Sequence, residues 1–581
     1  MKKSALSALC LAWILAGVPA RTQQQKPSPS QEPPVFGETV EVRVVNVEVV
    51  ITDKDGNRVT GLKPGDFKLK VDGKDVPVTY FTEVAGGQSV APPAAAEGAP
   101  AAVAVPGMEP GGAVGTSYLV FIDEYFSTET RRNEVLKSLQ GDLARLGPGD
   151  RMAIVAYDGG RLAIVSGWSQ SQSELARAFD QAMTRPARGL DRIAEFNSFQ
   201  HDQTFARGTV GDNAPLSITS RMDSSGLNLP ERAYGETLFR QEEGVVNAAA
   251  RTLRTFASSP GRKVLLLLAG GWPYSIQSYI RGGAAMPAAR ELKDGDQLLR
   301  KLTSTANLLG FTVYPVDVPG VQSAGDPSIT EAGGSYLDQG IEAPARAGAF
   351  RDQEAKRASG SANGSFRDQE IKGTLEFVAQ ETGGKPLRND NRLVALTTAV
   401  ADTRSYYWLG FSPTWERNDA SHKIAVTLAR AGLKVRSRTD FLDLSKKAEV
   451  SMLAESSLLF GNLPGGLTLP MRVGTPVRTR AGVEIPVTLG LPSDVVTLVP
   501  VGNKYAAHAE LRFAATDNSG NDSKIPVAPL DITSEKPAKP GGFIKYETKI
   551  TLKGKANRLV ATVYDPISGK IATAETSLTL P

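Results

Sequence analysis

The sequence predicts a chain of several domains, in which an α/β domain precedes an all-β domain. The apolar run from Ser117 to Asp123 lacks polar alternation, which is typical of a strand buried on both faces of a parallel sheet. Helix-period and strand-period segments alternate up to about residue 412, and the helical pattern disappears after about residue 450. The length of 581 residues also exceeds what one ordinary core supports.

The N-terminus has the pattern of an export signal. Lys2 and Lys3 precede an apolar run over 5–18, and the residues from Val18 to Ala20 suit cleavage. An uncleaved membrane anchor is the alternative, but the run is shorter than the roughly 20 residues that a span needs. We therefore expect residues 1–20 to be a signal peptide and the mature chain to be periplasmic or extracellular.

The composition of the mature chain argues against two classes of function. Cleavage removes Cys10, which is the only cysteine, so no disulfide or thiol chemistry remains. The formal charge of +4 includes two lysines of the signal, and the small remainder gives no electrostatic case for binding nucleic acid. No later stretch is long and apolar enough for a membrane span, so we expect no transmembrane segment after cleavage.

The segments before the α/β domain predict a spacer, a β-module and a linker. Residues 21–34 are rich in Gln, Pro and Ser and are expected to be disordered. Alternating Val residues and the turn Asp72-Gly73 predict a small β-module over 35–85. Residues 86–115 contain mostly Gly, Ala, Pro and Val, which predicts a linker.

The α/β domain is expected over residues 116–412. Its predicted strands cover 117–123, 152–157, 162–165, 264–268, 311–316 and 406–411. Its predicted helices cover 135–146, 171–183, 245–256, 298–309, 371–381 and 393–400. An insertion at 185–235 is expected to be irregular. A second insertion at 320–370, which is rich in Gly, Ala and Ser and contains FRDQE twice, is expected to be disordered.

Two β-rich segments complete the chain. Residues 423–428 and 433–438 predict a β-hairpin extension within 413–445. The alternating strands of residues 450–581 predict an Ig-like β-sandwich.

Six segments follow one another between residues 38 and 440: LKPGDFKLKVDG, YLVFID, GETLF, GRKVLLLLAGG, ETGGK and SYYWLGFSP. Their order and spacing resemble those of a von Willebrand factor A (VWFA) domain, and more closely the related exported proteins of Acidobacteria. The resemblance implies a Rossmann-like, parallel-rich sheet wrapped by helices, with a site at the carboxyl ends of the strands.

In this family a divalent cation, usually Mg²⁺, is held by an Asp-x-Ser-x-Ser loop, a Thr on a second loop and an Asp on a third. Asp123 and Ser127 match the first and last positions of the first loop, and Thr237 matches the second loop. The resemblance therefore implies Asp123, Ser127 and Thr237 as the metal ligands. Each of them could instead have a purely structural role, because Asp, Ser and Thr at such positions often cap a helix or loop.

The chain departs from this pattern at two positions. Tyr125 stands in place of the middle serine, and Gly270 or Ala269 stands where the third loop should supply a carboxylate. Because Mg²⁺ prefers several oxygen ligands, we expect at most weak binding, unless Glu124 or Glu236 substitutes. The sequence thus predicts a degenerate adhesion site without a cofactor, or with weakly bound Mg²⁺.

The favoured hypothesis is an exported, non-enzymatic adhesion protein that binds a protein partner at the rim of the sheet. The expected rim residues are Asp123, Glu124, Tyr125, Ser127, Thr237 and Gly270. One alternative is a metal-dependent adhesion domain that recognises an acidic group, and another is a hydrolase with its site in the 185–235 insertion. We expect no catalytic residues, because the histidines share no ligand spacing and no nucleophile elbow or phosphate loop is present. We expect the aromatic residues Tyr406 to Trp408 to be core rather than a binding patch.

Overall fold

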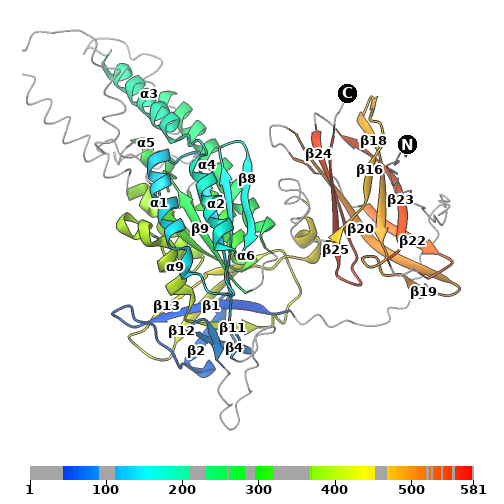
Figure 1. Ribbon diagram of the computed structural model, residues 1–581, viewed down its shortest axis with the longest axis horizontal. Coiled ribbons are helices and arrows are strands. Elements are labelled where there is room, and N and C mark those ends of the chain that lie inside the picture. The colour runs from blue at the N-terminus through cyan, green and yellow to red at the C-terminus, as the bar shows by residue number, and fades with distance from the viewer. Residues whose placement is uncertain are drawn as a thin grey trace, which may run out of the picture. The chain divides into compact units, whose positions relative to one another are not determined.

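The computed structural model describes the following residues: 43–90, 111–208, 229–257, 261–281, 295–318, 367, 369–451, 454, 467–517, 522–524, 528–537, 541–552 and 556–578. The described residues divide into two compact units, one that ends at residue 448 and one that begins at residue 449 (Figure 1). The expected signal peptide and spacer, and most of the 320–370 insertion, lie outside the described residues.

The larger unit contains a five-stranded sheet with the order β10-β9-β6-β7-β8. Its strands are β6 (Thr116–Asp123), β7 (Arg151–Tyr157), β8 (Leu162–Ser169), β9 (Arg262–Ala269) and β10 (Phe311–Asp317). All neighbours pair in parallel except β8, which is the antiparallel edge strand. Every residue of β6 is buried. The parallel-rich sheet predicted from the sequence is therefore confirmed.

Helices cover both faces of this sheet. They are α1 (Glu129–Gly141), α2 (Gln172–Met183), α3 (Gly189–Gly208), α4 (Leu229–Thr255), α5 (Ile276–Arg281), α6 (Gly295–Leu309), α9 (Ala395–Thr403) and helical residues 369–381, with 3-10 turns η2 (Leu143–Arg145) and η4 (Asn389–Val394). Alternate residues of β6, among them Val120 and Ile122, share a core with α1, α2 and α9. On the other face α4 contacts β6 and β7, and α6 contacts β10. None of the described helices is long and apolar enough to span a membrane.

The prediction for the 185–235 insertion is wrong in its described part. The segment contains the whole of α3 and the first turns of α4, which begins at residue 229. An aromatic cluster holds the two helices together, and in it Phe199 of α3 stacks on Tyr234 of α4 with ring centroids 4.6 Å apart. Only a narrow stripe of each helix is buried and the outer faces are polar, so the helical spacing of apolar residues is weak in the sequence.

A β-sandwich in the same unit is built from strands that precede and follow the α/β domain in the sequence. One sheet has the order β13-β1-β11-β4-β5 and the other β14-β12-β2-β3. The strands are β1 (Val45–Thr52), β2 (Phe67–Val71), β3 (Lys74–Val76), β4 (Tyr80–Ala85), β5 (Gln88–Val90), β11 (Tyr406–Phe411), β12 (Ser421–Leu428), β13 (Lys434–Ser437) and β14 (Asp440–Leu442), and η1 (Pro64–Asp66) precedes β2. The α/β domain is thus inserted between β5 and β11.

This arrangement corrects three predictions. Strand β11 does not belong to the parallel sheet but lies antiparallel between β1 and β4. Strands β12 and β13 do not form a hairpin, because β12 pairs with β2 and β14 while β13 pairs with β1. Residues 88–90 of the expected linker form β5. The α/β domain therefore ends before β11, and the boundary at residue 412 is wrong.

The burial of β11 accounts for the first error. Tyr407, Leu409 and Phe411 face the core of the sandwich. Tyr406 lies on the opposite face, where the guanidinium of Arg262 sits 4.2 Å above its ring. Arg262 opens β9 and also forms an ion pair of 3.1 Å with Glu48 of β1. The sandwich thus packs on the amino ends of the parallel strands, which gives β11 two buried faces and confirms Tyr406 to Trp408 as core.

The second unit is all β in its described part. One of its sheets has the order β15-β25-β24-β20-β19, with β21 and β22 also paired to β20, and the other joins β16, β17 and β23 to β18. The strands are β15 (Leu467–Thr468), β16 (Met471–Val473), β17 (Val477–Thr479), β18 (Gly482–Pro492), β19 (Val499–Val501), β20 (Lys504–Asp517), β21 (Asp522–Lys524), β22 (Ala528–Ser534), β23 (Phe543–Leu552), β24 (Ala556–Tyr564) and β25 (Ile571–Ser577). Residues of both sheets share one core.

Candidate functional site

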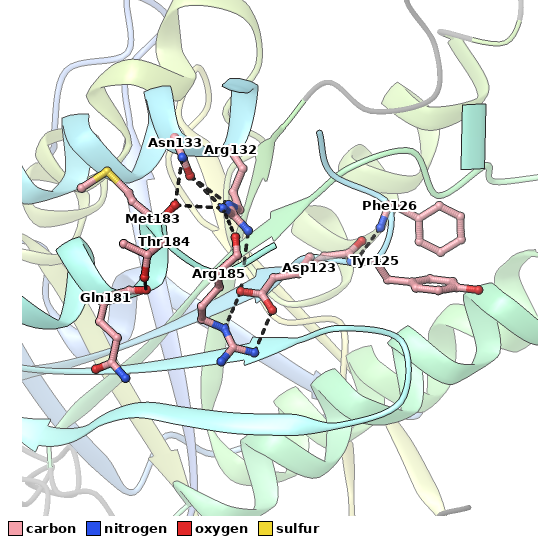
Figure 2. Close-up of polar contacts among 10 residues, drawn as sticks. Asp123, Tyr125, Phe126, Arg132, Asn133, Gln181, Met183, Thr184 and Arg185 are labelled. Atoms are coloured by element: carbon pink, nitrogen blue, oxygen red, sulfur yellow. Dashed lines mark hydrogen bonds and ion pairs between the residues drawn. The ribbon is translucent and has the colours of Figure 1, made fainter. Parts of the chain in front are cut away.

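Asp123 is the last residue of β6, and its side chain is completely buried. Oδ1 accepts hydrogen bonds from the backbone amides of Tyr125 at 2.9 Å and Phe126 at 3.1 Å (Figure 2). Oδ2 accepts one from the indole Nε1 of Trp272 at 2.7 Å, and the backbone of Gly270 supplies a further hydrogen bond. Both carboxylate oxygens therefore accept hydrogen bonds from N–H groups, two of them on Oδ1 and one from the indole on Oδ2.

These donors do not fully offset the burial of the charge. Burial raises the pKa of Asp123 to about 6, although the hydrogen bonds from Trp272, Phe126, Tyr125 and Gly270 favour the ionised form. The carboxylate is thus held in a preorganised cradle of N–H donors rather than in a ring of oxygen atoms.

Trp272 was not among the candidates from the sequence. It follows the third loop, and its side chain is fully buried. The only signal in the sequence is an aromatic residue directly after two glycines at the end of the most apolar strand. Its indole N–H donates to the carboxylate of Asp123, which the family resemblance implies as a metal ligand.

Position 270 of the third loop lies too close to Ser127 and Val318 to carry a side chain. A Cβ atom built on Gly270 would lie 2.7 Å from the carbonyl oxygen of Val318 and 2.9 Å from Ser127 Oγ. The expected substitution of a carboxylate by glycine is therefore a packing requirement of this loop. The hydroxyl of Ser127 is buried and has no hydrogen-bond partner within the described part of the chain.

Glu124 is bound on the far side of the loop and does not face Asp123. Its carboxylate accepts hydrogen bonds from Arg185 Nε at 2.7 Å and Nη2 at 2.9 Å, and Arg132 Nη1 lies 3.6 Å from Oε1. Arg132 itself is buried and is bonded to Asn133 and to the carbonyl oxygens of Met183 and Arg185 (Figure 2). Glu124 therefore anchors the loop and is not a substitute metal ligand.

Thr237 does not lie on a loop. It is inside α4, and its hydroxyl donates to the carbonyl oxygen of Ala233 at 3.0 Å, one turn earlier. Glu236 is exposed on the same helix and pairs with Arg232 at 3.1 Å. Thr237 nevertheless approaches the first loop, because it lines a surface pocket together with Tyr125. The implied position of Thr237 on a second loop is therefore wrong.

The residues present do not fit a divalent cation. Both oxygens of Asp123 already accept hydrogen bonds from N–H groups, Thr237 donates within its helix, and position 270 has no room for a carboxylate. Of the expected ligands, Ser127 alone keeps a hydroxyl without a partner among the described residues, and one hydroxyl is too weak a ligand set for Mg²⁺. Across the described residues, no three side chains of His, Cys, Asp or Glu form a potential metal-binding group.

The described part of the insertion gives no support to the hydrolase alternative. The pocket beside it is lined by Tyr125, Tyr157, Gly159, Thr237, Arg240, Gln241 and Gly244, none of which is a histidine or carboxylate. His201 is exposed on α3. His422 contacts Asp72 at 2.7 Å and lies 5.2 Å from the ring of Trp415 in the sandwich, and His508 pairs with Asp531 in the second unit.

No model of a known protein family matches the chain, and no curated protein matches it. Solved structures with some similarity include the von Willebrand factor domain of the type V pili tip protein Mfa5 from Porphyromonas gingivalis. That match has 13% identity and a TM-score of 0.15, and covers 27% of this chain and 38% of that chain.

Two further structures align along most of this chain. A von Willebrand factor type A protein from Catenulispora acidiphila has 9% identity and a TM-score of 0.21, covering 90% of this chain and 74% of that chain. The pilus adhesin SpaC from Lactobacillus rhamnosus GG has 9% identity and a TM-score of 0.18, covering 90% of this chain and 62% of that chain. These TM-scores are low, and the α/β fold of this chain is defined by its own strand order.

Proposed function

We propose that the chain is an exported, non-enzymatic adhesion protein whose VWFA-related α/β domain binds a protein partner at the carboxyl edge of its sheet. The observation that supports the proposal is the carboxylate of Asp123, both oxygens of which accept hydrogen bonds from N–H donors, including the indole of Trp272. The β-sandwich occupies the opposite edge through Arg262 and Glu48, which leaves the rim as the edge that can meet a partner.

Divalent cations provide the first test of this proposal. The chain without residues 1–20 is titrated with Mg²⁺ and Mn²⁺ in a calorimeter, beside a Ser127→Ala variant. We expect no saturable heat for either protein. Micromolar binding that Ser127→Ala or Asp123→Ala abolishes would instead establish the metal-dependent alternative, which the unpartnered hydroxyl of Ser127 favours.

Partner capture provides the second test. The immobilised chain is exposed to secreted proteins of its source organism in buffer with Mg²⁺ or with a chelator. We expect the same partner to be retained in both buffers and to be lost from a Tyr125→Ala variant. Tyr505→Ala is the matched control, because this tyrosine belongs to β20 of the other unit. Retention by Tyr125→Ala at the wild-type level would contradict binding at the rim.

A further inference from the structure

A small pocket lies beside the first loop, between the β7–β8 turn and α4. Its volume is about 270 Å³, and it opens to solvent. It is lined by residues of all three segments: Tyr125 from the loop, Tyr157 and Gly159 from the turn, and Thr237, Arg240, Gln241 and Gly244 from α4. The volume is below the about 300–1,000 Å³ of most small-molecule sites, and suits one inserted side chain better than a metabolite.

Two glycines shape the walls of the pocket. Gly159 has φ +94°, and a Cβ atom there would lie 2.1 Å from the ring of Tyr125, so the ring can rest on the turn only because the side chain is missing. Gly244 lies inside α4, where glycine is unfavourable, and a Cβ atom there would lie 3.3 Å from Tyr157 Oη. Helix propensity disfavours Gly244, which is consistent with a requirement for open space at this position.

The pocket carries a positive charge that no carboxylate of the described residues neutralises. Arg240 is exposed, and its Nε donates to the carbonyl oxygen of Glu236 at 3.1 Å. Among the described residues its guanidinium forms no ion pair, so Nη1 and Nη2 remain available. Nearby carboxylates already have partners: Glu236 pairs with Arg232, Glu195 with Arg192, and Asp158 accepts the amides of Gly160 and Arg161.

Tyr125 adds a directed donor. Arg192 Nη1 donates to the phenolic oxygen of Tyr125, and its guanidinium lies 4.3 Å from the ring centroid. Because Arg192 uses the oxygen as an acceptor, the hydroxyl proton of Tyr125 remains free to donate elsewhere.

We propose that this pocket receives the carboxylate of an Asp or Glu side chain from the protein partner, with Arg240 supplying the charge and Tyr125 a hydrogen bond. The inference rests on the proposed function and names the chemistry of the partner. Arginine suits this role because its planar guanidinium offers paired N–H donors to a carboxylate.

The test uses a probe of defined chemistry. A short peptide of alternating Gly and Glu, and the same peptide with Gln in place of Glu, are immobilised, and binding of the chain without residues 1–20 is measured in chelator at low salt. We expect the Glu peptide to bind at least about tenfold more tightly than the Gln peptide, and Arg240→Gln to remove this difference.

Arg177→Gln is the matched control. Arg177 is also exposed on a helix, its Nε donates to a carbonyl oxygen one turn earlier, Ser173 at 3.4 Å, and it lies outside the pocket. The two variants lose the same charge, so a general effect of net charge would weaken binding equally in both. Equal binding by Arg240→Gln and Arg177→Gln would overturn the inference, as would equal binding of the two peptides or no binding by the wild-type chain.

Gly244→Ala distinguishes an effect on binding in the pocket from an effect on the stability of the fold. The substitution favours the helix and places a methyl group in the pocket, so we expect weaker binding of the Glu peptide with an unchanged or raised melting temperature. Undiminished binding would count against the pocket. If Tyr125→Ala loses the captured partner while Arg240→Gln retains it, the inference fails and the proposed function stands. If both variants retain the partner, both fail.

Discussion

The indole Nε1 of Trp272 donates to Asp123 Oδ2 over 2.7 Å, and both side chains are completely buried although 149 residues separate them in the sequence. The bond joins the end of β6 to the loop after β9, so that a direct hydrogen bond connects these two segments at the carboxyl edge of the sheet. A hydrogen bond to a buried charge is among the stronger single contacts in a protein. The conformation of the two loops should therefore depend on this pair.

The first prediction concerns Trp272→Phe. The variant keeps a buried aromatic ring but removes the N–H donor, which leaves one side of the Asp123 carboxylate undersatisfied. We expect the free energy of unfolding to fall by about 2–3 kcal/mol at neutral pH in urea titrations. The pKa of Asp123 should rise further, because one of the hydrogen bonds that lower it is lost.

Trp168→Phe is the control for this prediction. Trp168 lies on β8 and packs edge-on against Phe256 with ring centroids 5.4 Å apart. We expect its substitution to cost less than that of Trp272 and to leave the pKa of Asp123 unchanged. Equal losses in the two variants would mean that ring packing, and not the indole donor, stabilises the rim.

The second prediction concerns pH. The pKa of Asp123 is about 6 in the folded chain and 3.8 in the unfolded reference. A raised pKa means that the folded state binds the proton more tightly, so this contribution to stability is complete below pH 3.8 and is lost as the pH rises through about 6. The size of the effect is about 3 kcal/mol.

Asp123→Asn isolates this contribution. The side-chain amide of Asn does not titrate. Its N–H group would face the indole N–H of Trp272, and this mismatch of two donors lowers stability equally at every pH. We expect the wild-type chain to lose about 2 kcal/mol relative to the variant between pH 4 and pH 7 in urea unfolding. Parallel stability curves for the two proteins would show that Asp123 titrates normally.

The sequence was sufficient for the parallel sheet and for the position of Asp123, because a fully apolar strand that ends in a carboxylate is typical of the centre of a parallel sheet. It was misleading for β11, whose two buried faces imitate a parallel strand while its partners are β1 and β4. Pairing between residues more than 300 positions apart leaves no local pattern to read.

Site residues whose partners lie far away in the sequence could not be identified from the sequence either. Trp272 has no role that can be inferred from the sequence alone, since its partner is defined only after the two loops meet. Arg185 lay in a segment interpreted as irregular, yet it forms both hydrogen bonds to Glu124. A motif identifies positions on one loop, whereas the partners of these positions depend on tertiary packing.

The third prediction concerns Glu124→Gln. The substitution leaves Arg185 and the fully buried Arg132 without a counter-charge. Removing one partner of a buried ion pair typically costs about 3–5 kcal/mol, and the loss should persist in high salt because burial limits screening. Glu134→Gln is the control, since Glu134 pairs with Arg131 on the surface and its loss should cost at most about 1 kcal/mol. A loss at Glu124 that salt abolishes would contradict a buried pair.

The fourth prediction tests whether one substitution, which adds the carboxylate that the family pattern has on its third loop, is enough to create a metal site. Gly270→Asp supplies the missing carboxylate, but its Cβ atom would meet Val318 O at 2.7 Å and Ser127 Oγ at 2.9 Å. We expect a loss of stability of about 2 kcal/mol or more and no stabilisation by Mg²⁺ in thermal unfolding. Gly65→Asp is the control, because its Cβ atom would meet nothing within 4 Å. A rise in melting temperature with Mg²⁺ would show that the loop can open for a cation.

The last prediction concerns Glu242, which lies on the buried face of α4 and whose two carboxylate oxygens lack any partner among the described residues. Burial raises the pKa of Glu242 well above its ordinary value, so burying the carboxyl costs least while it is protonated and opposes folding more strongly as the pH rises through the raised pKa. Glu242→Met replaces it with an unbranched apolar side chain of good helix propensity.

We expect Glu242→Met to raise the free energy of unfolding by about 1–3 kcal/mol at neutral pH, because an unsatisfied buried polar group is removed. The gain over the wild-type chain should increase toward alkaline pH, since only the wild type must then bury a charge. Glu243→Met is the control: its carboxylate is partly exposed and pairs with Lys301 at 2.6 Å, so its loss should change stability by at most about 1 kcal/mol. A destabilised Glu242→Met variant would mean that the carboxyl has a partner, such as a bound water, whose hydrogen bond outweighs the cost of burying it.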